Sequence, residues 1–251
     1  MSQGSSALDK RLLAADVGNS VVHLGVFEDG ELITETKVPT GEVTPQIVKD
    51  HLLNAGAIAV SSVVPSITPV FLRLANELGV SSLAVDHTLD LGVELDLEDP
   101  SQVGADRLCN VVAAHLIYGP PAIVIDFGTA TTFDLLRVGG IYVGGLILPG
   151  ALLQAAVLSH ATAQLPLIDV RIPAHLFGRN TVEAIRAGVF YGSIGGVKFI
   201  CEKLRNELGE FRLVLTGGGL AFFKKELGIE GSCDPHLTLK GLRLIYERNK
   251  N

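Results

Sequence analysis

The stretch LLAADVGNSVVHLGVF, residues 12–27, decides the fold. One apolar run leads to Asp16, Gly18-Asn19 makes a tight turn, and a second apolar run carries the chain away. A Gly-Asn pair between two β-rich runs predicts a hairpin. Because Asp is depleted in strands, a carboxylate at the mouth of the hairpin favours a binding role. Turn N–H groups bind anions and carboxylates bind the accompanying metal, so we interpret the stretch as a phosphate-plus-metal hairpin. An ordinary hairpin with Asp16 as a turn former remains the alternative.

The same theme returns in the second half of the chain. AIVID, residues 122–126, is an apolar strand that ends in Asp126, and FGTATT, residues 127–132, turns the chain. Each copy opens a meander of three expected strands, over 11–38 and over 122–147, and alternating helices and strands follow. This repeat predicts an α/β layer fold in two related halves, with domains over 10–118 and 119–251 and the two turns facing each other across a cleft.

Composition narrows the class of protein. The chain has 251 residues, 47% of them hydrophobic, and carries 20 basic against 27 acidic side chains, a net charge of −7. That balance argues against nucleic acid as a partner, because such binding needs a basic footprint. Three scattered cysteines without a CxxC pair predict a reducing, cytoplasmic location. No apolar run approaches the roughly 20 residues that span a bilayer, so we expect no membrane partner.

A third motif, Gly104-Ala105-Asp106-Arg107, lies near the start of a helix expected over 102–118. Asp106 is a candidate general base and Arg107 a candidate anion clamp. Asn110, one helical turn further on, is placed to orient Asp106. The alternative is a plain capping carboxylate, which the helix dipole favours.

A fourth motif opens the longest expected helix, over 181–208. Asn180 and Glu183 have the spacing of a capping box. Four glycines share one face of this helix: Gly188, Gly192, Gly195 and Gly196. Each glycine destabilises a helix interior by about 1 kcal/mol relative to alanine, so four of them predict close approach of another helix, within the chain or across a dimer interface.

Taken in order, the motifs resemble those of the type III pantothenate kinases, over roughly residues 11–248. The motifs are DVGNS at 16–20, GADR at 104–107, DFGTATT at 126–132, GGLILPG at 144–150, GRNT at 178–181 and TGGG at 216–219. The family belongs to the acetate and sugar kinase/Hsc70/actin superfamily, so the resemblance implies two RNase H-like, actin-like ATPase domains. Many members have Tyr where this chain has Leu97.

The resemblance also implies a reaction and its residues. The reaction is ATP-dependent phosphorylation of pantothenate to 4'-phosphopantothenate, the first step of coenzyme A biosynthesis, by a homodimer. Asp106 is implied as the proton acceptor, within a pantothenate site of Gly104, Ala105, Asp106, Arg107 and Thr181. The implied ATP contacts are Asp16, Val17, Gly18, Asn19, Ser20, Val21, Val22, His23 and Thr129. Asp16 is implied near Mg²⁺, and Asp126 as the ligand of K⁺ or NH₄⁺.

Two other functions remain open from the sequence. One is a kinase of the same superfamily with a different small-molecule acceptor, which a panel of acceptors would distinguish. The other is a non-catalytic regulatory or scaffold protein on the same fold. The presence of Asp16, Asp106 and Asp126 weighs against that second alternative. A purely structural domain would not need three such acidic sites.

Overall fold

The structure, a computed structural model, describes residues 11–250. Within them the chain divides into two compact units. The first unit comprises residues 11–117, 140–142 and 236–250, and the second comprises 118–139 and 143–235.

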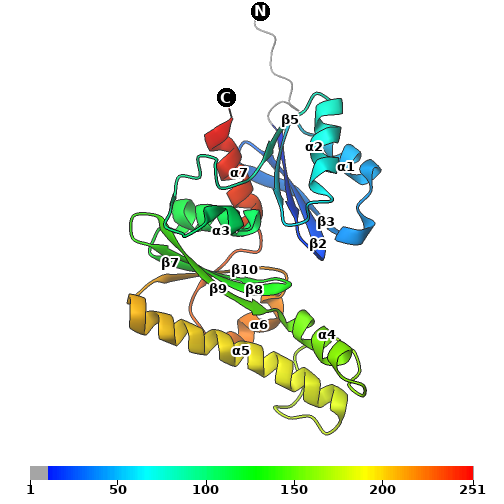
Figure 1. The fold of residues 1–251 in the computed structure, drawn as a ribbon, viewed down its shortest axis with the longest axis vertical. Helices are drawn as coiled ribbons and strands as arrows, with labels where there is room; N and C mark the ends of the chain where they lie inside the picture. The colour runs from blue at the N-terminus through cyan, green and yellow to red at the C-terminus, as the bar shows by residue number, and fades with distance from the viewer. Residues whose placement is uncertain (1–10, 251) are drawn as a thin grey trace, which may run out of the picture. The chain divides into compact units, whose positions relative to one another are not determined.

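The first unit is built on a mixed five-stranded sheet (Figure 1). Strands β1 (Arg11–Val17), β2 (Val21–Glu28) and β3 (Glu31–Pro39) form an antiparallel meander. Helix α1 (Pro45–Leu52) leads to β4 (Ala57–Ser62), and α2 (Thr68–Glu77) leads to β5 (Ser81–Ala84). Because β4 pairs parallel to β1 and β5 parallel to β4, the order is β3-β2-β1-β4-β5.

Two helices from distant parts of the chain complete this unit. Helix α3 (Ala105–Ala113) packs against α7 (Leu237–Asn249), as Figure 1 shows, and α7 also contacts β1. A Cβ at Gly241 would overlap the carbonyl of Cys109, so this glycine allows the two helices to pack closely. The connecting segments between residues 40 and 118 contain short elements: η2 (Thr40–Glu42), β6 (Glu94–Leu95), η3 (Pro100–Gln102) and the π-helical turn η4 (Ala114–Tyr118).

The second unit repeats this arrangement. Its meander is β7 (Ala122–Phe127), β8 (Ala130–Arg137) and β9 (Ile141–Pro149), followed by α4 (Ala151–Ala161) and α5 (Thr181–Leu208). Strand β10 (Arg212–Thr216) pairs parallel to β7, and after α6 (Leu220–Leu227) the short β11 (Ser232–Cys233) pairs parallel to β10. The sheet order is β11-β10-β7-β8-β9-β6, so β9-β8-β7-β10-β11 matches β3-β2-β1-β4-β5 strand for strand. The predicted α/β fold with a duplicated half is confirmed.

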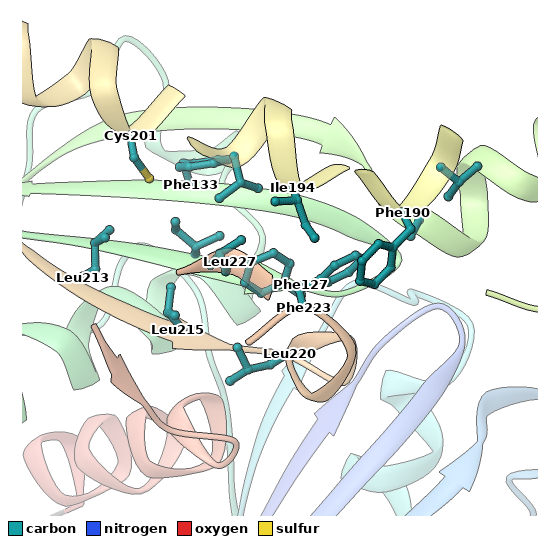
Figure 2. Close-up of a cluster of buried hydrophobic side chains, with 14 of the residues drawn as sticks. Phe127, Phe133, Phe190, Ile194, Cys201, Leu213, Leu215, Leu220, Phe223 and Leu227 are labelled. Carbon is teal, nitrogen blue, oxygen red and sulfur yellow. The ribbon is translucent and has the colours of Figure 1, made fainter. Parts of the chain in front are cut away.

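An aromatic core joins α5 and α6 to the sheet of the second unit (Figure 2). The ring of Phe223, from α6, lies 5.4 Å from that of Phe127 and 5.5 Å from that of Phe190, between ring centroids. Aromatic pairs at such distances add to the free energy gained by burying the rings themselves. This core fixes the end of β7, where Asp126 lies.

Several local expectations were wrong. The turn after Asp126 is shorter than 127–132, because β8 begins at Ala130 and takes Thr131 and Thr132 into the strand. Helix α3 begins at Ala105 rather than 102, because residues 100–102 form the separate turn η3. The domain division at 118 and 119 stays a prediction; by compactness α7 groups with the first unit, since it packs on α3 and β1.

Candidate functional site

In the first unit the turn at Gly18–Ser20 is held by three hydrogen bonds. Gly18 N donates to Val21 O at 3.1 Å, and Thr40 N donates to Ser20 O at 3.0 Å. The Thr40 hydroxyl donates to Gly18 O at 2.7 Å. Asn19 and Ser20 remain exposed at the tip. The turn is therefore fixed from the end of β3 while its outer side stays open to a ligand.

The predicted ATP-binding stretch contains buried apolar side chains and one histidine that contacts an acidic residue. Val17 and Val22 are fully buried in the core, so only their main chain is available to a ligand. His23 contacts Glu35, with Nε2 and Oε2 2.6 Å apart, and Glu35 also contacts His236 at 3.0 Å. Burial lowers the pKa of His23, against the opposing effect of the Glu35 contact.

Asp16 lies beside a buried hydroxyl on the neighbouring strand. It faces Ser61 in the parallel pairing of β1 with β4, and Ser61 Oγ donates to Asp16 Oδ1 at 3.2 Å. The thiol of Cys109, from α3, is also hydrogen-bonded to Ser61. Burial, together with the carboxylates of Asp16 and Asp106, raises the pKa of Cys109 well above its ordinary value. The two predicted functional carboxylates of this unit, Asp16 and Asp106, therefore both raise the pKa of the same buried thiol.

Asp106 occupies the first turn of α3, where Gly104 is the N-cap residue. Its Oδ1 accepts a hydrogen bond from Arg107 N at 2.8 Å. A Cβ at Gly104 would lie 2.5 Å from the same oxygen, so a larger residue at this position would displace the carboxylate. Burial raises the pKa of Asp106, opposed by that backbone hydrogen bond and by the charge of Arg107. A partly buried carboxylate with a raised pKa is a suitable general base.

Asn110, which the sequence placed to orient Asp106, contacts helix α7. Its Oδ1 accepts a hydrogen bond from Thr238 Oγ1, on α7, at 2.9 Å, and only 1% of the residue is exposed. This contact joins α3 to α7. Asn110 thus supports the helix that carries Asp106.

In the second unit Asp126 ends β7 in the way that Asp16 ends β1. It pairs with Thr132 on β8 and with Thr216 on β10. Gly217 has φ +92°, and a Cβ there would overlap Asp126 Oδ1. Glycine here lets the main chain pass directly beside the carboxylate oxygen. Thr129 is exposed in the turn after β7, and its carbonyl accepts a hydrogen bond from Gly150 N at 3.0 Å.

Thr181 lies on the wall of an open groove of about 880 Å³ within the second unit. The groove is lined by Pro149, by residues of α4 and by the first turns of α5, mostly with apolar side chains. The first bond of the predicted capping box is confirmed, because Glu183 N donates to Asn180 Oδ1 at 3.0 Å. The side chain of Glu183 accepts its return bond from Arg179 N, one residue before the N-cap, at 3.1 Å. This cap fixes the start of the helix, so Thr181 presents its hydroxyl from a rigid frame.

The glycine face of α5 has no partner helix within the described residues. A Cβ at Gly188, Gly192, Gly195 or Gly196 would have no neighbour within 4 Å. The expectation of close helix packing within the chain is therefore wrong. Packing against a second copy of the chain stays a prediction.

The predicted site residues thus form two groups. Gly104, Ala105, Asp106 and Arg107 lie in the first unit with residues 16–23, while Asp126, Thr129 and Thr181 lie in the second. Sequence reasoning missed Thr40, Ser61 and Cys109, which contact these groups from other elements. The only sequence signal for Ser61 was its place at the end of a buried strand parallel to β1.

Comparison with known proteins identifies a relationship along most of the chain. A family model described as type III pantothenate kinase matches residues 12–203. The chain is 38% identical over 255 residues to a type III pantothenate kinase of Moorella thermoacetica, which covers 95% of this chain and 99% of that protein. It is also 37% identical over 252 residues to one of Bacillus cytotoxicus, with 95% and 96% covered.

Solved structures share the fold at low sequence identity. The ethanolamine utilization protein EutJ from Carboxydothermus hydrogenoformans has a TM-score of 0.53 and 16% identity, over 94% of this chain and 89% of its own. This similarity, together with the repeated sheet order, shows the actin-like ATPase fold. In residues 11–250 no helix combines the length and apolar character needed to cross a bilayer.

Proposed function

Because the chain belongs to the type III pantothenate kinase family, we propose that it transfers the γ-phosphoryl group of ATP to the primary hydroxyl of pantothenate, the first step of coenzyme A biosynthesis. The observation that supports this most strongly is Asp106, a partly buried carboxylate with a raised pKa at the start of α3. Phosphoryl transfer depends on placement and charge neutralisation, with one base to receive the acceptor's proton.

Asp106 acts on the acceptor. Its carboxylate accepts the proton of the pantothenate hydroxyl as that oxygen attacks phosphorus. The adjacent Arg107 holds an anionic group, either the pantothenate carboxylate or the phosphate being transferred. Gly104 leaves the space next to Asp106 Oδ1 that any larger residue would fill.

The turn at Gly18–Ser20 binds the phosphates of ATP through its main chain. Asp16 is the protein ligand of the Mg²⁺ that accompanies ATP. Mg²⁺ is commonly held by one or two carboxylates plus phosphates and water, so the single carboxylate at the end of β1 fits it. When bound, the ion supplies positive charge beside the phosphates.

Asp126 holds a monovalent cation, K⁺ or NH₄⁺, near the ATP-binding turn that contains Thr129. Replacing K⁺ with Na⁺ at constant ionic strength should slow turnover, and the Asp126→Ala variant should be slow in both salts. Equal rates of the unmodified enzyme in the two salts would contradict this role.

The acceptor site includes Thr181 and part of the groove between α4 and α5, where apolar walls surround a few polar groups. The protein works as a cytoplasmic homodimer whose interface includes the open glycine face of α5. Helix faces of small residues allow another helix to approach closely, which accounts for four glycines in an otherwise regular helix.

The test of this function is a panel of acceptors. ADP release should require pantothenate and should be absent with sugars, acetate and other hydroxy acids. ADP release with a sugar instead would assign the chain to a different kinase activity on the same fold. No release with any acceptor would favour a regulatory protein.

A further inference from the structure

Ser61 lies in a position that the proposed reaction does not yet use. Its hydroxyl is fully buried at the end of β4 and donates to Asp16 Oδ1 at 3.2 Å. It also forms a hydrogen bond with the thiol of Cys109, which is itself fully buried. Serine at the end of a buried strand is a costly choice for packing alone, because a buried hydroxyl must be hydrogen-bonded.

The contact with Asp16 sets the direction of these bonds. Ser61 Oγ donates its single hydrogen to Asp16 Oδ1. In its hydrogen bond with Ser61 Oγ, the S–H group of Cys109 is therefore the donor. Cys109 thus acts as the outer support that fixes the rotation of the serine hydroxyl.

The duplicated fold places a second hydroxyl at the matching position. Asp126 faces Thr216 across the β7–β10 pair, just as Asp16 faces Ser61 across the β1–β4 pair. Thr216 is 2% exposed and Ser61 is fully buried. Both halves therefore combine a carboxylate at the end of the first strand with a buried hydroxyl on the adjacent parallel strand. A buried hydroxyl beside the carboxylate in both halves is expected if the hydroxyl has a function at the carboxylate.

We propose that Ser61 is a positioning residue for Asp16: its hydroxyl, supported by Cys109, fixes the carboxylate in the orientation that receives the Mg²⁺ of the bound nucleotide. This inference rests on the proposed role of Asp16. The hydrogen bond from Ser61 Oγ to Asp16 Oδ1 is the contact through which the serine fixes the carboxylate. Residues that orient a metal-binding carboxylate typically change metal affinity about 10- to 100-fold when they are removed.

The next residue provides a matched control. Ser62 lies on the same strand, but its hydroxyl contacts Val64 and Thr68, at the start of α2, rather than Asp16. Ser62→Ala removes a partly buried hydroxyl of equal size from the same strand. A general weakening of β4 would therefore affect both variants, whereas loss of positioning would affect only the Ser61 variant.

The experiment measures Mn²⁺ binding in the presence of saturating ADP, by electron paramagnetic resonance of the free ion. Ser61→Ala should raise the dissociation constant of Mn²⁺ at least about tenfold, and Ser62→Ala should leave it within about twofold. Ser61→Cys, which keeps the shape of the side chain in a slightly larger form with a weak donor, should give a dissociation constant between those of the two alanine variants. It decides the matter if Ser61→Ala does not fold. In turnover assays, the Ser61 variants should reach half of their maximal rate at a higher Mg²⁺ concentration, while their KM for pantothenate stays unchanged.

Two outcomes overturn the inference, and the Asp16→Asn variant distinguishes them. If Asp16→Asn weakens Mn²⁺ binding and the Ser61 variants do not, Asp16 holds the metal without help from Ser61. If Asp16→Asn leaves Mn²⁺ binding unchanged, the proposed role of Asp16 is wrong, and the role of Ser61 is wrong with it.

Discussion

At the scale of single residues, Asp106 combines two properties that oppose each other. Burial raises its pKa, which is useful in a base that must hold a proton during the reaction. The same burial makes the charged carboxylate costly to the folded protein at neutral pH. Function and stability therefore make different demands on this one side chain.

The first prediction concerns stability. Because the pKa of Asp106 is higher in the folded than in the unfolded chain, its contribution to stability is fully present at low pH and is lost as pH rises through the folded-state pKa. Asp106→Asn should therefore raise the free energy of unfolding at pH 7, with little change at pH 3. Denaturant unfolding at both pH values measures this; a lower stability of the variant at pH 7 would show that the charged carboxylate is not destabilising.

The second prediction concerns pH and rate. If Asp106 is the general base, turnover needs its ionised carboxylate, so kcat/KM for pantothenate should fall on the acid side as Asp106 takes up a proton. Since its pKa is raised, that fall should begin at a higher pH than for an ordinary aspartate. The pH profile of kcat/KM measures it. An acid limb at the position of an unperturbed aspartate would contradict the assignment.

At the scale of elements, the turn at Gly18–Ser20, which we propose binds phosphate, depends on a residue that follows β3. Thr40, in η2, bonds both Gly18 and Ser20. Thr40→Val should retain the backbone bond, lose the hydroxyl bond, destabilise the protein by about 1 kcal/mol and raise the KM for ATP. Steady-state kinetics with varied ATP measures the effect on binding.

A threonine that caps α1 supplies the control for this variant. Thr44 Oγ1 accepts a hydrogen bond from Ile47 N at 3.3 Å, away from the turn. Thr44→Ala should destabilise the protein by about the same amount, typically ~1 kcal/mol for an N-cap, without changing the KM for ATP. Equal KM values for the two variants would show that Thr40 acts on stability alone.

Elements were predicted from the sequence where local signals are strong. Apolar runs with turn residues located β1 to β3, and the Asn180–Glu183 capping box located the start of α5. The sequence pattern predicted a turn at Thr131 and Thr132, because both residues are polar. In the structure they belong to β8, because they pair with residues of β7. The contact of Ser61 with Asp16 could not be predicted, because it depends on the register between strands separated by a helix.

At the scale of the whole molecule, the repeat was predictable and the grouping of α7 was not. Matching motifs at Asp16 and Asp126 indicated two related halves, and the two sheet orders confirm it. Helix α7 follows the second sheet in sequence but packs on α3, through Gly241 and Thr238. Nothing local in the sequence of α7 indicates this long-range contact.

The oligomeric state is the prediction that belongs to this scale. In the chain alone a side chain at Gly192 meets open space, so Gly192→Leu should leave the fold intact. If the glycine face of α5 packs against a second copy, the same change should convert dimers to monomers in sedimentation velocity. Gly41→Leu, at another open glycine, is the control and should stay dimeric. A Gly192→Leu variant that sediments like the unmodified protein would exclude this face as the interface.

The central claim is that Asp106 activates pantothenate for attack on ATP. A coupled assay of ADP release, in K⁺ with Mg²⁺, tests it most directly when the unmodified protein and Asp106→Asn are compared with and without pantothenate. We predict release that requires pantothenate and falls by at least about 10²-fold in the variant, which remains folded. Release without pantothenate, or near-normal release by the folded variant, would contradict the account.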